Sequence, residues 1–263
     1  MRNNTRKKRR FLVLWFAGTV LLLFVCCIAV AAFVSSHASQ VKIPAKSEPS
    51  LGEASVSSGN PVLLSVPLLA QGTEYPTGCE SVSAAMLLRY WEIPVSVDSL
   101  IAALPQEWLY QDADGTWYGP HPNDVFIGSP YSEDGSFGCY APVIAAALSK
   151  FLPQGYTVKA ENGAPLSSLT QDYIDLGIPV LIWASVGMQE TCSGMSWYLE
   201  DGSLFTWTQG EHCLVLVGYD ESAYYLNDPT GEGGTVCYPK DLVEERYQSL
   251  FSQAVVILPP NAE

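Results

Sequence analysis

The stretch Gln71-Gly-Thr-Glu-Tyr-Pro-Thr-Gly-Cys79-Glu-Ser-Val-Ser-Ala-Ala-Met-Leu-Leu-Arg-Tyr-Trp91 joins a polar, turn-rich segment to an apolar one. Pro76 and Gly78 favour a turn, and the apolar residues that follow recur at helical spacing, so the pattern predicts a helix that begins at or beside Cys79. A helix N-terminus favours a thiolate through its dipole and its free backbone N–H groups, so we expect a lowered pKa for Cys79. Cysteine is also commonly buried, so this position alone makes Cys79 no more than a candidate nucleophile.

A cysteine nucleophile needs a base, and the chain contains three histidines. His37 lies in a Ser-rich segment that predicts no fixed geometry. His121 lies in Gly-Pro-His-Pro-Asn, where a surface or substrate-lining role is more common than that of a base. His212 opens the apolar run His212-Cys-Leu-Val-Leu-Val-Gly-Tyr219, which predicts a strand. A residue at the end of a strand can face a cleft while its backbone is held, so we expect His212 to be the base.

An acidic residue is predicted to lie beside His212. The next predicted strand, 223–227, ends at Asn227-Asp228-Pro229. A turn at 220–222 makes the two strands an antiparallel pair whose far ends meet, so Asp228 is the expected neighbour that orients the His212 ring. Asn227 is the alternative orienter. Asn-Asp-Pro is also a common turn signal, and the two roles are compatible.

Gln71, eight residues before Cys79, offers a side-chain amide that can point at an oxyanion alongside the backbone N–H of Cys79. A single glutamine is weak support for a catalytic site. The ordered set of a glutamine, a cysteine at a helix start, a histidine at a strand edge and an aspartate after the next strand is more specific than any of its members.

The same residues resemble a known family, the papain-like C-thirty-nine-like peptidases, which are related to the domains that cleave double-glycine leader peptides in bacteriocin exporters. The resemblance covers residues 61–258 and rests on Val66-Pro-Leu-Leu-Ala-Gln71, Gly78-Cys-Glu-Ser81 with Ala85-Met-Leu-Leu88, His212-Cys-Leu-Val-Leu-Val-Gly-Tyr-Asp220 and Asn227-Asp-Pro229. It implies a papain-like α+β fold and a bacterial source. It also implies that Cys79 is the nucleophile, His212 the base, Asp228 its orienter and Gln71 the oxyanion donor.

Two features depart from the family pattern. No exporter transmembrane or ATPase module follows the matching region, and residues 110–138 form a long segment rich in Asp, Gly, Pro and Tyr. A leader-peptide substrate is therefore not implied. Loops of that length in a compact domain usually have a function, and we expect a surface loop there.

The order of the predicted elements indicates an α+β fold whose N-terminal helical half packs on a C-terminal antiparallel sheet. Helices are predicted over 82–90, 97–104, 141–150 and 168–176, with Asp98 near the cap of the second and Gly177 ending the fourth. Strands are predicted over 61–67, 179–186, 212–219, 223–227, 235–238 and 254–258. Trp183, Trp197 and Trp207 are expected to pack inside the domain rather than to line a groove.

The first sixty residues predict three further segments. Residues 1–10 are basic and are followed by an uncharged stretch, 11–34. This stretch is longer than the roughly 7–15 residues of a signal-peptide core and matches the about 20 that cross a bilayer, so we expect a retained transmembrane anchor. By the positive-inside rule residues 1–10 are cytoplasmic, and the domain at 61–260 lies outside the cell at the end of a flexible linker, 35–60. Cleavage near Ala38 is the alternative.

Charge and cysteine content bear on the partners of the domain. Residues after position 40 hold all 27 acidic side chains and seven of the thirteen basic ones, a formal charge of 7 − 27 = −20. This field disfavours nucleic acid and would attract a cationic peptide or wall peptide, although it also serves solubility. In an oxidising compartment up to two disulfides can form among Cys139, Cys192, Cys213 and Cys237, with Cys79 left free.

The sequence shows no metal-ligand spacing, phosphate-binding loop or nucleotide fingerprint, so no cofactor and no metal is expected. Glu80 and Glu211, next to the two expected catalytic residues, could tune the pKa values there, but we interpret them as exposed neighbours with little effect. The leading hypothesis is a membrane-anchored, extracytoplasmic cysteine peptidase that acts through a thioester. The alternatives are a catalytically silent papain-like module that binds peptide or wall material, and a cell-wall amidase or acyl transferase with the same triad.

Overall fold

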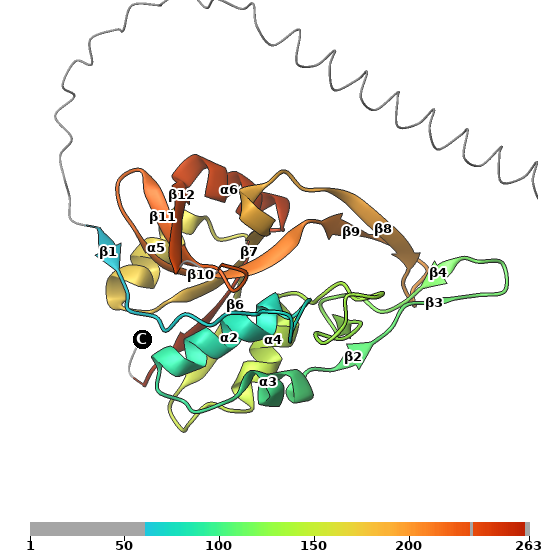
Figure 1. Ribbon diagram of the computed structural model, residues 1–263, viewed down its shortest axis with the longest axis horizontal. Helices are drawn as coiled ribbons and strands as arrows, with labels where there is room; N and C mark the ends of the chain where they lie inside the picture. The colour runs from blue at the N-terminus through green and yellow to red at the C-terminus, as the bar shows by residue number, and fades with distance from the viewer. Residues whose placement is uncertain (1–60, 232–233, 261–263) are drawn as a thin grey trace, which may run out of the picture. The chain divides into compact units, whose positions relative to one another are not determined.

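Seven strands form an antiparallel sheet at the centre of the computed structural model, which describes residues 61–231 and 234–260 (Figure 1). They are β1 (Val62–Leu63), β6 (Thr157–Asn162), β7 (Val180–Ser185), β10 (Glu211–Tyr219), β11 (Ala223–Asn227), β12 (Thr235–Pro239) and β13 (Gln253–Leu258). Six of them run in the order β12-β11-β10-β7-β13-β6, and β1 pairs with β10 outside this order. The five strands predicted after residue 178 are confirmed to within one or two residues, and the antiparallel sheet is confirmed with them.

Both faces of this sheet are buried. Successive side chains of a strand point to opposite sides of the sheet, and those of β10 enter two different cores. In β10, Cys213, Val215 and Val217 belong to one hydrophobic core, and Leu214 and Leu216 belong to the other. The strand therefore reads as one apolar run rather than as an alternation of apolar and polar residues.

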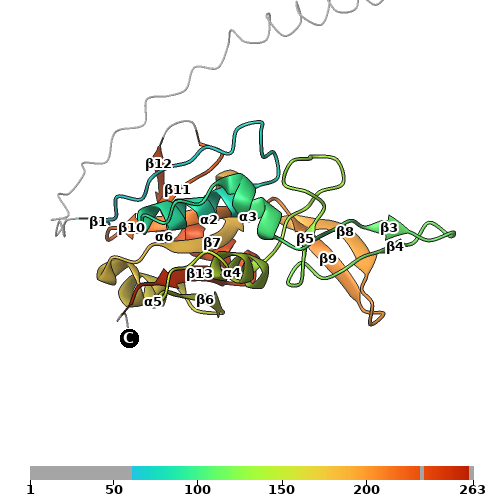
Figure 2. The same ribbon diagram turned by 90° about the horizontal axis from the view of Figure 1, so that it is seen from below.

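Helices lie on both sides of the sheet (Figure 1, Figure 2). On one side are α2 (Cys79–Tyr90), α3 (Val97–Ala103) and α4 (Ala141–Ser149), and on the other are α5 (Leu166–Asp172) and α6 (Lys240–Ser249). Ten of the twelve residues of α2 are buried, as expected for a helix enclosed between the sheet and its helical neighbours. The three helices predicted before residue 151 are confirmed, including the proline in the first turn of α4.

The prediction of a helical half packed on a sheet is too simple. Helix α6 and strand β6 were not predicted: α6 buries only Val243, Arg246 and Tyr247, and β6 has no buried residue. The helix predicted over 168–176 is also divided, since α5 ends at Asp172 and a separate 3-10 turn, Ile174–Leu176, leads to Gly177. The fold is thus a mixed α/β arrangement with helices on both faces of an antiparallel sheet.

Asp98 lies near the cap of α3, as predicted, although it is not the capping residue itself. Ser96 is the capping residue, and its hydroxyl accepts the backbone N–H of Ser99 at 3.1 Å. Asp98 lies in the first turn instead and accepts the hydroxyls of Tyr75 at 3.1 Å and Tyr131 at 2.8 Å. Asp98 thereby ties the turn before α2 to the loop around residue 131.

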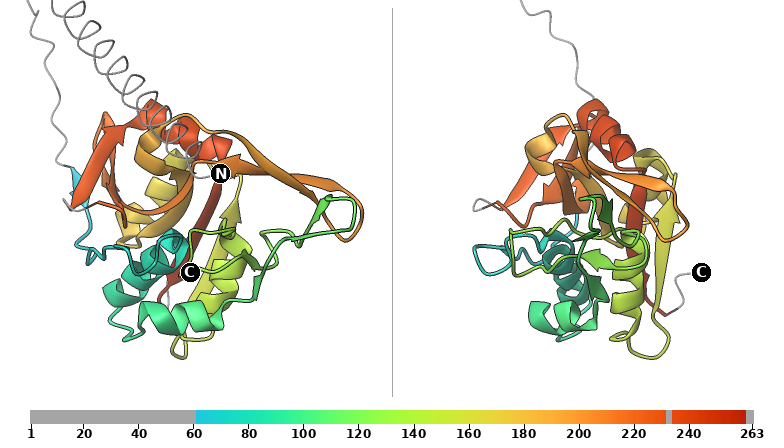
Figure 3. Two further views of the ribbon diagram at one scale, coloured as in Figure 1. Left: turned by 45° about the vertical axis from the view of Figure 1, so that its right-hand side comes forward. Right: turned by 90° about the vertical axis from the view of Figure 1, so that its right-hand side faces the viewer.

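A second sheet projects from the first (Figure 1, Figure 3). It consists of β3 (Tyr110–Gln111), β4 (Trp117–Tyr118), β8 (Cys192–Tyr198) and β9 (Leu204–Gln209), in the order β3-β4-β8-β9. Two further short strands, β2 (Gln106–Glu107) and β5 (Phe126–Ile127), form a parallel pair. In the sequence, β2 precedes β3 and β5 follows β4. The expectation of a plain surface loop over 110–138 is therefore wrong, because β3, β4 and β5 lie within it.

The predicted segments 1–10, 11–34 and 35–60 lie outside the described residues. Among residues 61–231 and 234–260, no helix combines the length and the apolar character needed to cross a membrane. Over the same residues all five cysteines are free thiols, so none of the disulfides considered from the sequence is formed.

Candidate active site

Cys79 is the first residue of α2, in agreement with the sequence prediction. The preceding residue, Gly78, caps the helix, and its N–H donates to the carbonyl of Tyr75 at 2.9 Å. A Cβ atom at Gly78 would lie 2.7 Å from the Cβ of Tyr75, so only glycine lets the chain enter the helix through this turn. The turn places the thiol among the unpaired backbone N–H groups of the first helical turn.

Helix α2 holds Cys79 against β10. Ser83, one turn further along the same face, donates its hydroxyl to the backbone carbonyl of Cys213 at 3.0 Å. The thiol of Cys79 also receives a backbone hydrogen bond from Cys213. Since Cys213 directly follows His212, the helix N-terminus lies beside the strand position that carries the predicted base.

Two carboxyl groups surround the thiol. The Cys79 thiol donates to Oε2 of Glu80 at 3.3 Å, and Oε1 of Glu80 accepts the backbone N–H of Cys139 at 2.8 Å. Glu211 adds a second carboxyl group, and ligand atoms of Cys79, Glu80 and Glu211 all lie within 4.8 Å of one another. Oε1 of Glu211 is buried and has no hydrogen-bond partner in the described part of the chain. The interpretation of Glu80 and Glu211 as exposed neighbours is therefore wrong.

Burial dominates the ionisation of this carboxyl pair. It raises the pKa of Glu80 from 4.5 to about 7, against the lowering effect of the hydrogen bonds from Cys139 and Cys79. Burial and the charge of Glu80 likewise raise the pKa of Glu211 well above its ordinary value. Two carboxyl groups this close disfavour a second negative charge, so the pair retains a proton near neutral pH.

The same surroundings raise the pKa of the Cys79 thiol well above its ordinary value. Burial contributes most, followed by the charges of Glu80 and Glu211, whereas the backbone hydrogen bond from Cys213 acts in the opposite direction. The lowered pKa expected at a helix start is therefore wrong for this structure, because burial and the two carboxyl groups outweigh the helix dipole. The thiol is protonated in this arrangement.

The loop before α4 closes over the carboxyl pair. Gly138 has a φ of +143°, and a Cβ atom there would lie 2.5 Å from Oε1 of Glu80 and 3.4 Å from Oε2 of Glu211. The carbonyl of the next residue, Cys139, accepts the indole N–H of Trp183 at 3.0 Å. Backbone of this loop thus joins α2 to β7 around the thiol, and no side chain fits at position 138.

His212 and Asp228 form a buried pair, as predicted from the pairing of β10 with β11. Nε2 of His212 lies 2.8 Å from Oδ1 of Asp228, and the two residues are 2% and 6% exposed. Val215 pairs with Asn227 in the register of the two strands, which brings the end of β11 beside the start of β10. With Nε2 bound to the carboxylate, Nδ1 is the ring atom left to exchange a proton with a thiol.

Asp228 is held as a carboxylate. The backbone N–H and the hydroxyl of Thr230 donate to its Oδ1 at 2.8 and 2.7 Å. Burial opposes the charge, but the hydrogen bond and charge of His212 and the two bonds from Thr230 outweigh it and lower the pKa of Asp228 to about 2. Asp228 is therefore ionised at neutral pH and can stabilise an imidazolium there.

Asn227, the alternative orienter, has a different set of contacts. Its Nδ2 donates to the carbonyl of Val66 at 2.9 Å, and its Oδ1 accepts the hydroxyl of Thr235 at 2.7 Å. These bonds fix the segment that leads toward Gln71 against β11.

Gln71 is buried, and its hydrogen bonds join the segment around Asp228 to the turn before Cys79. Its backbone N–H donates to the carbonyl of Pro229 at 2.7 Å, next to Asp228. Its side-chain Nε2 donates to the carbonyl of Pro76 at 2.8 Å, and its Oε1 has no partner in the region described. One N–H of the amide therefore holds the turn before Cys79, and the other is free to donate to a ligand.

The structure does not join the thiol to the histidine. Within residues 61–231 and 234–260 no hydrogen bond links Cys79 to His212, because the thiol donates to Glu80 instead. Catalytic hydrogen bonds are often long or misaligned before substrate binds, so a change in the Cys79 side chain would be part of reaching an active arrangement.

The remaining residues considered from the sequence lie outside this cluster. The ring of His121 packs against Phe205 with 4.8 Å between ring centroids, and its Nδ1 accepts the backbone N–H of Asn123. Burial lowers the pKa of His121. The three tryptophans expected to pack inside the domain are buried: Trp183, Trp197 and Trp207.

Comparison with known proteins places these observations in a family. The sequence profile described as the Peptidase_C39 like family matches residues 63–255. The chain belongs to this family. Membership of the Peptidase_C39 like family confirms the resemblance read from the four sequence motifs and indicates a function of the cysteine-peptidase type.

Two relatives are similar to this member of the family over most of its length. The chain is 27% identical over 183 residues to the uncharacterized protein YvpB of Bacillus subtilis (strain 168), which is 68% of either chain. It is also similar to a crystal structure of a Bacillus anthracis protein provisionally described as a C39-like peptidase, with 27% identity, a TM-score of 0.67, and 76% of this chain and 98% of that chain covered. A double glycine motif protease from an AMS/PCAT transporter, solved with its leader peptide, has 17% identity and a TM-score of 0.44 over 76% and 97% of the chains, too distant to argue from.

Proposed function

We propose that this chain is a cysteine peptidase that hydrolyses a peptide-like amide through a thioester. The observation that carries the proposal is the buried pair of His212 and Asp228, which lies beside the strand position against which the Cys79 thiol packs. A family of peptidases, a cysteine at a helix N-terminus and a histidine held by an ionised carboxylate together fit nucleophilic catalysis.

In the proposed reaction the Cys79 thiol leaves Glu80 and gives its proton to Nδ1 of His212. The sulfur attacks the amide carbon, and the oxyanion is stabilised by the backbone N–H of Cys79 and the free N–H of the Gln71 amide. The C–N bond then breaks as the imidazolium returns the proton to the leaving amine. Water, deprotonated by His212, hydrolyses the thioester to release the acid and restore the thiol. Asp228 keeps the imidazole in one tautomer throughout.

The proposed substrate is a peptide or a cell-wall peptide, and the same chemistry would serve a wall amidase or acyl transferase. We place the domain outside the cell, anchored by residues 11–34, on the basis of the uncharged stretch and the basic residues before it. Protease added to intact cells should then release the domain, whereas a domain that is degraded only after lysis would contradict this placement.

One observation favours a second function, a catalytically silent module that binds peptide. The thiol is protonated and bonded to Glu80 rather than to the histidine, which is also the arrangement expected of an unused nucleophile. The two functions differ in whether Cys79 forms a covalent bond with a substrate-like electrophile.

A peptidyl vinyl sulfone, which alkylates only an activated thiol bound next to it, separates the two functions. We expect mass spectrometry of the full-length protein to find one adduct, at Cys79, and none in Cys79→Ala. His212→Ala should slow adduct formation by about 10²-fold or more, because the proton acceptor is lost.

Cys237→Ala is the matched control, since Cys237 is a free and exposed thiol on β12. It should leave the rate of adduct formation at Cys79 unchanged. Labelling of Cys237 in preference to Cys79, or equal labelling of Cys79 with and without His212, would rule out the peptidase and leave the silent module.

A further inference from the structure

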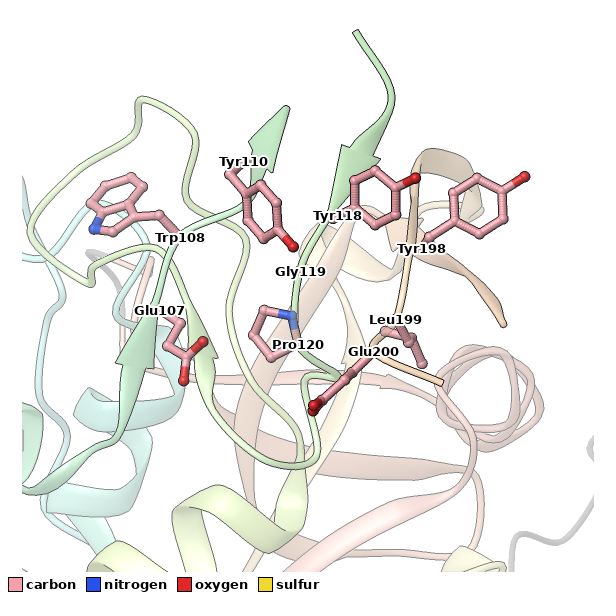
Figure 4. A pocket seen from close by; sticks show the side chains of 9 residues that line it. All are labelled: Glu107, Trp108, Tyr110, Tyr118, Gly119, Pro120, Tyr198, Leu199 and Glu200. Carbon is pink, nitrogen blue, oxygen red and sulfur yellow. The ribbon is translucent and has the colours of Figure 1, made fainter. Parts of the chain in front are cut away.

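The second sheet carries an open aromatic groove whose lining does not include Cys79. The aromatic groove is a cavity of about 310 Å³ bounded by Glu107, Trp108, Tyr110, Tyr118, Gly119, Pro120, Tyr198, Leu199 and Glu200. Three tyrosines from three neighbouring strands form a row across it (Figure 4). Tyr118 is the direct cross-strand partner of both Tyr110 and Tyr198, with 5.8 Å between ring centroids on each side.

The two outer rings of this row and the neighbouring Trp108 are exposed, whereas Tyr118 between the outer rings is half-buried. Such a group of exposed large aromatic residues is unusual. Trp108 is 52% exposed, Tyr110 60% and Tyr198 40%. Adjacent exposed aromatic side chains mark binding surfaces, because single exposed apolar residues are common but clusters of them are not. Nothing in the fold of residues 61–231 and 234–260 covers these rings.

The groove rests on a rigid base. Trp197, which precedes Tyr198 on β8, points to the opposite face of the strand and is fully buried. Its indole N–H donates to the carbonyl of Pro120 at 3.0 Å, and its ring packs against Phe137 and Phe205 at 5.4 and 4.9 Å. The strand that carries Tyr198 and the segment that follows Tyr118 are thus fixed to each other before any ligand binds, which lowers the entropic cost of binding.

Charge determines which ligand suits the groove. Glu107 and Glu200 lie on the same side of the tyrosine row, with Pro120 between them (Figure 4). The region around the groove, residues 105–140 and 189–211, contains no lysine and no arginine. We call it the acidic region, and its carboxyl groups belong to Glu107, Asp112, Asp114, Asp124, Glu133, Asp134, Glu190, Glu200, Asp201 and Glu211.

We propose that the aromatic groove binds an extended peptide segment that carries lysine or arginine side chains. Cationic groups are attracted to tyrosine faces and to carboxylates, and the stems of these side chains cover aromatic surface while the charge stays in water. A neutral glycan would stack on the rings as well, but it would gain nothing from the nine exposed carboxyl groups of the acidic region, which have no counter-charge there. The charge therefore favours the cationic peptide.

The groove also has a direct connection to the candidate active site. Strand β9, paired with β8, ends at Gln209, and β10 begins at Glu211, one residue before His212. A peptide held in the groove is therefore held by the hairpin that leads into the catalytic strand. Binding in the groove does not rest on the proposed peptidase activity, because none of the groove residues takes part in it.

Fluorescence anisotropy of the full-length protein tests the proposal with a labelled twelve-residue peptide of alternating lysine and serine. We expect saturable binding that weakens at high salt, and binding by Cys79→Ala that equals that of the unchanged protein. The double variant Glu107→Gln/Glu200→Gln and the variant Tyr110→Ala should each bind the peptide at least about five-fold more weakly. The first lacks the carboxylates and the second lacks a ring that would contact the lysine side chains. All three residues are exposed, so these changes leave the fold intact.

Two controls make the result decisive. The control Glu92→Gln/Glu221→Gln removes the same charge from two exposed glutamates outside the acidic region. It should change the affinity less than about two-fold, because isolated exposed charges contribute little free energy. The same peptide with glutamate in place of lysine should not bind. The proposal is overturned by an absence of binding, by equal effects of the two double variants, or by a neutral chitin oligosaccharide that binds the groove where the lysine peptide does not. If the protein binds the lysine peptide but forms no vinyl sulfone adduct at Cys79, the result contradicts the proposed peptidase activity and leaves the proposed peptide binding standing.

Discussion

At the scale of single residues, the environment of Cys79 is set by Glu80 as much as by the helix. The sequence correctly predicts the helix start, and hence the position of the thiol, because Pro76, Gly78 and an apolar repeat are local signals. It does not reveal that Glu80 is fully buried, since that follows from contact with the loop at Cys139, 59 residues away. A carboxyl group that reads as a surface residue from its neighbours in the chain is therefore the main influence on the thiol besides burial itself.

Glu80→Gln is expected to change both stability and reactivity. The pKa of Glu80 is raised from 4.5 to about 7, so between these values the folded chain binds a proton that the unfolded chain has lost. This stabilising contribution is complete below about pH 4.5 and is lost as the pH rises through 7, a change on the order of 3 kcal/mol. Glutamine keeps the bond to the Cys139 N–H and carries no charge, so in urea unfolding of the variant this decline should be shallower. The part that remains belongs to Glu211, whose pKa burial also raises.

The same substitution removes a negative charge beside the thiol. It should therefore lower the pH at which the rate of Cys79 alkylation reaches half of its maximum. Glu92→Gln, at an exposed position just after α2, is the control and should leave both profiles unchanged. A Glu80→Gln variant whose stability falls between pH 4.5 and 7 as steeply as that of the unchanged protein would show that Glu80 is not the group that titrates.

At the scale of elements, the sequence predicts long apolar stretches well and predicts mixed stretches poorly. Strands β10 and β11 and helix α2 are buried along most of their length, so their own composition determines their structure. Helix α6 buries one narrow stripe, and β8 and β9 mix polar and aromatic residues of which few are buried. Their structure depends on tertiary contacts that local patterns do not contain.

Gly78→Ala tests whether the turn before α2 positions the nucleophile. The added methyl group would lie 2.7 Å from the Cβ of Tyr75, and both atoms belong to positions fixed by backbone. We expect a loss of about 1–3 kcal/mol of unfolding free energy, together with a large loss of vinyl sulfone labelling, because α2 must begin at a different angle. Gly163→Ala is the control: it has a positive φ of +79° but open space, so it should lose stability without any loss of labelling per folded molecule. Equal labelling by the two variants would mean that the turn does not position the thiol.

At the scale of the whole molecule, the candidate site combines segments with very different separations in the chain. His212 on β10 and Asp228, the residue just after β11, are 16 residues apart, so hairpin geometry was enough to predict their contact. Ser83 and Cys213 are 130 residues apart, and the cluster of Cys79, Glu80 and Glu211 depends on that contact. Local patterns therefore predicted the contact between His212 and Asp228, whereas the packing of α2 on β10 placed Glu80 and Glu211 around the Cys79 thiol.

The distribution of charge over the whole molecule leads to a last prediction, about substrate capture. All basic residues between 61 and 260 lie outside the acidic region: Arg89, Lys150, Lys159, Lys240 and Arg246. A field of one sign raises the encounter rate with cationic peptides, and it fades as the Debye length falls from about 30 Å at 0.01 M salt to about 8 Å at 0.15 M. We expect kcat/KM for a lysine-containing peptide substrate to fall about ten-fold over this range while kcat stays nearly constant. A neutral peptide of the same length, cleaved at the same bond, should show little change. If salt lowers kcat/KM equally for both peptides, it acts on the fold or the chemistry, and the negative field has no part in the choice of substrate.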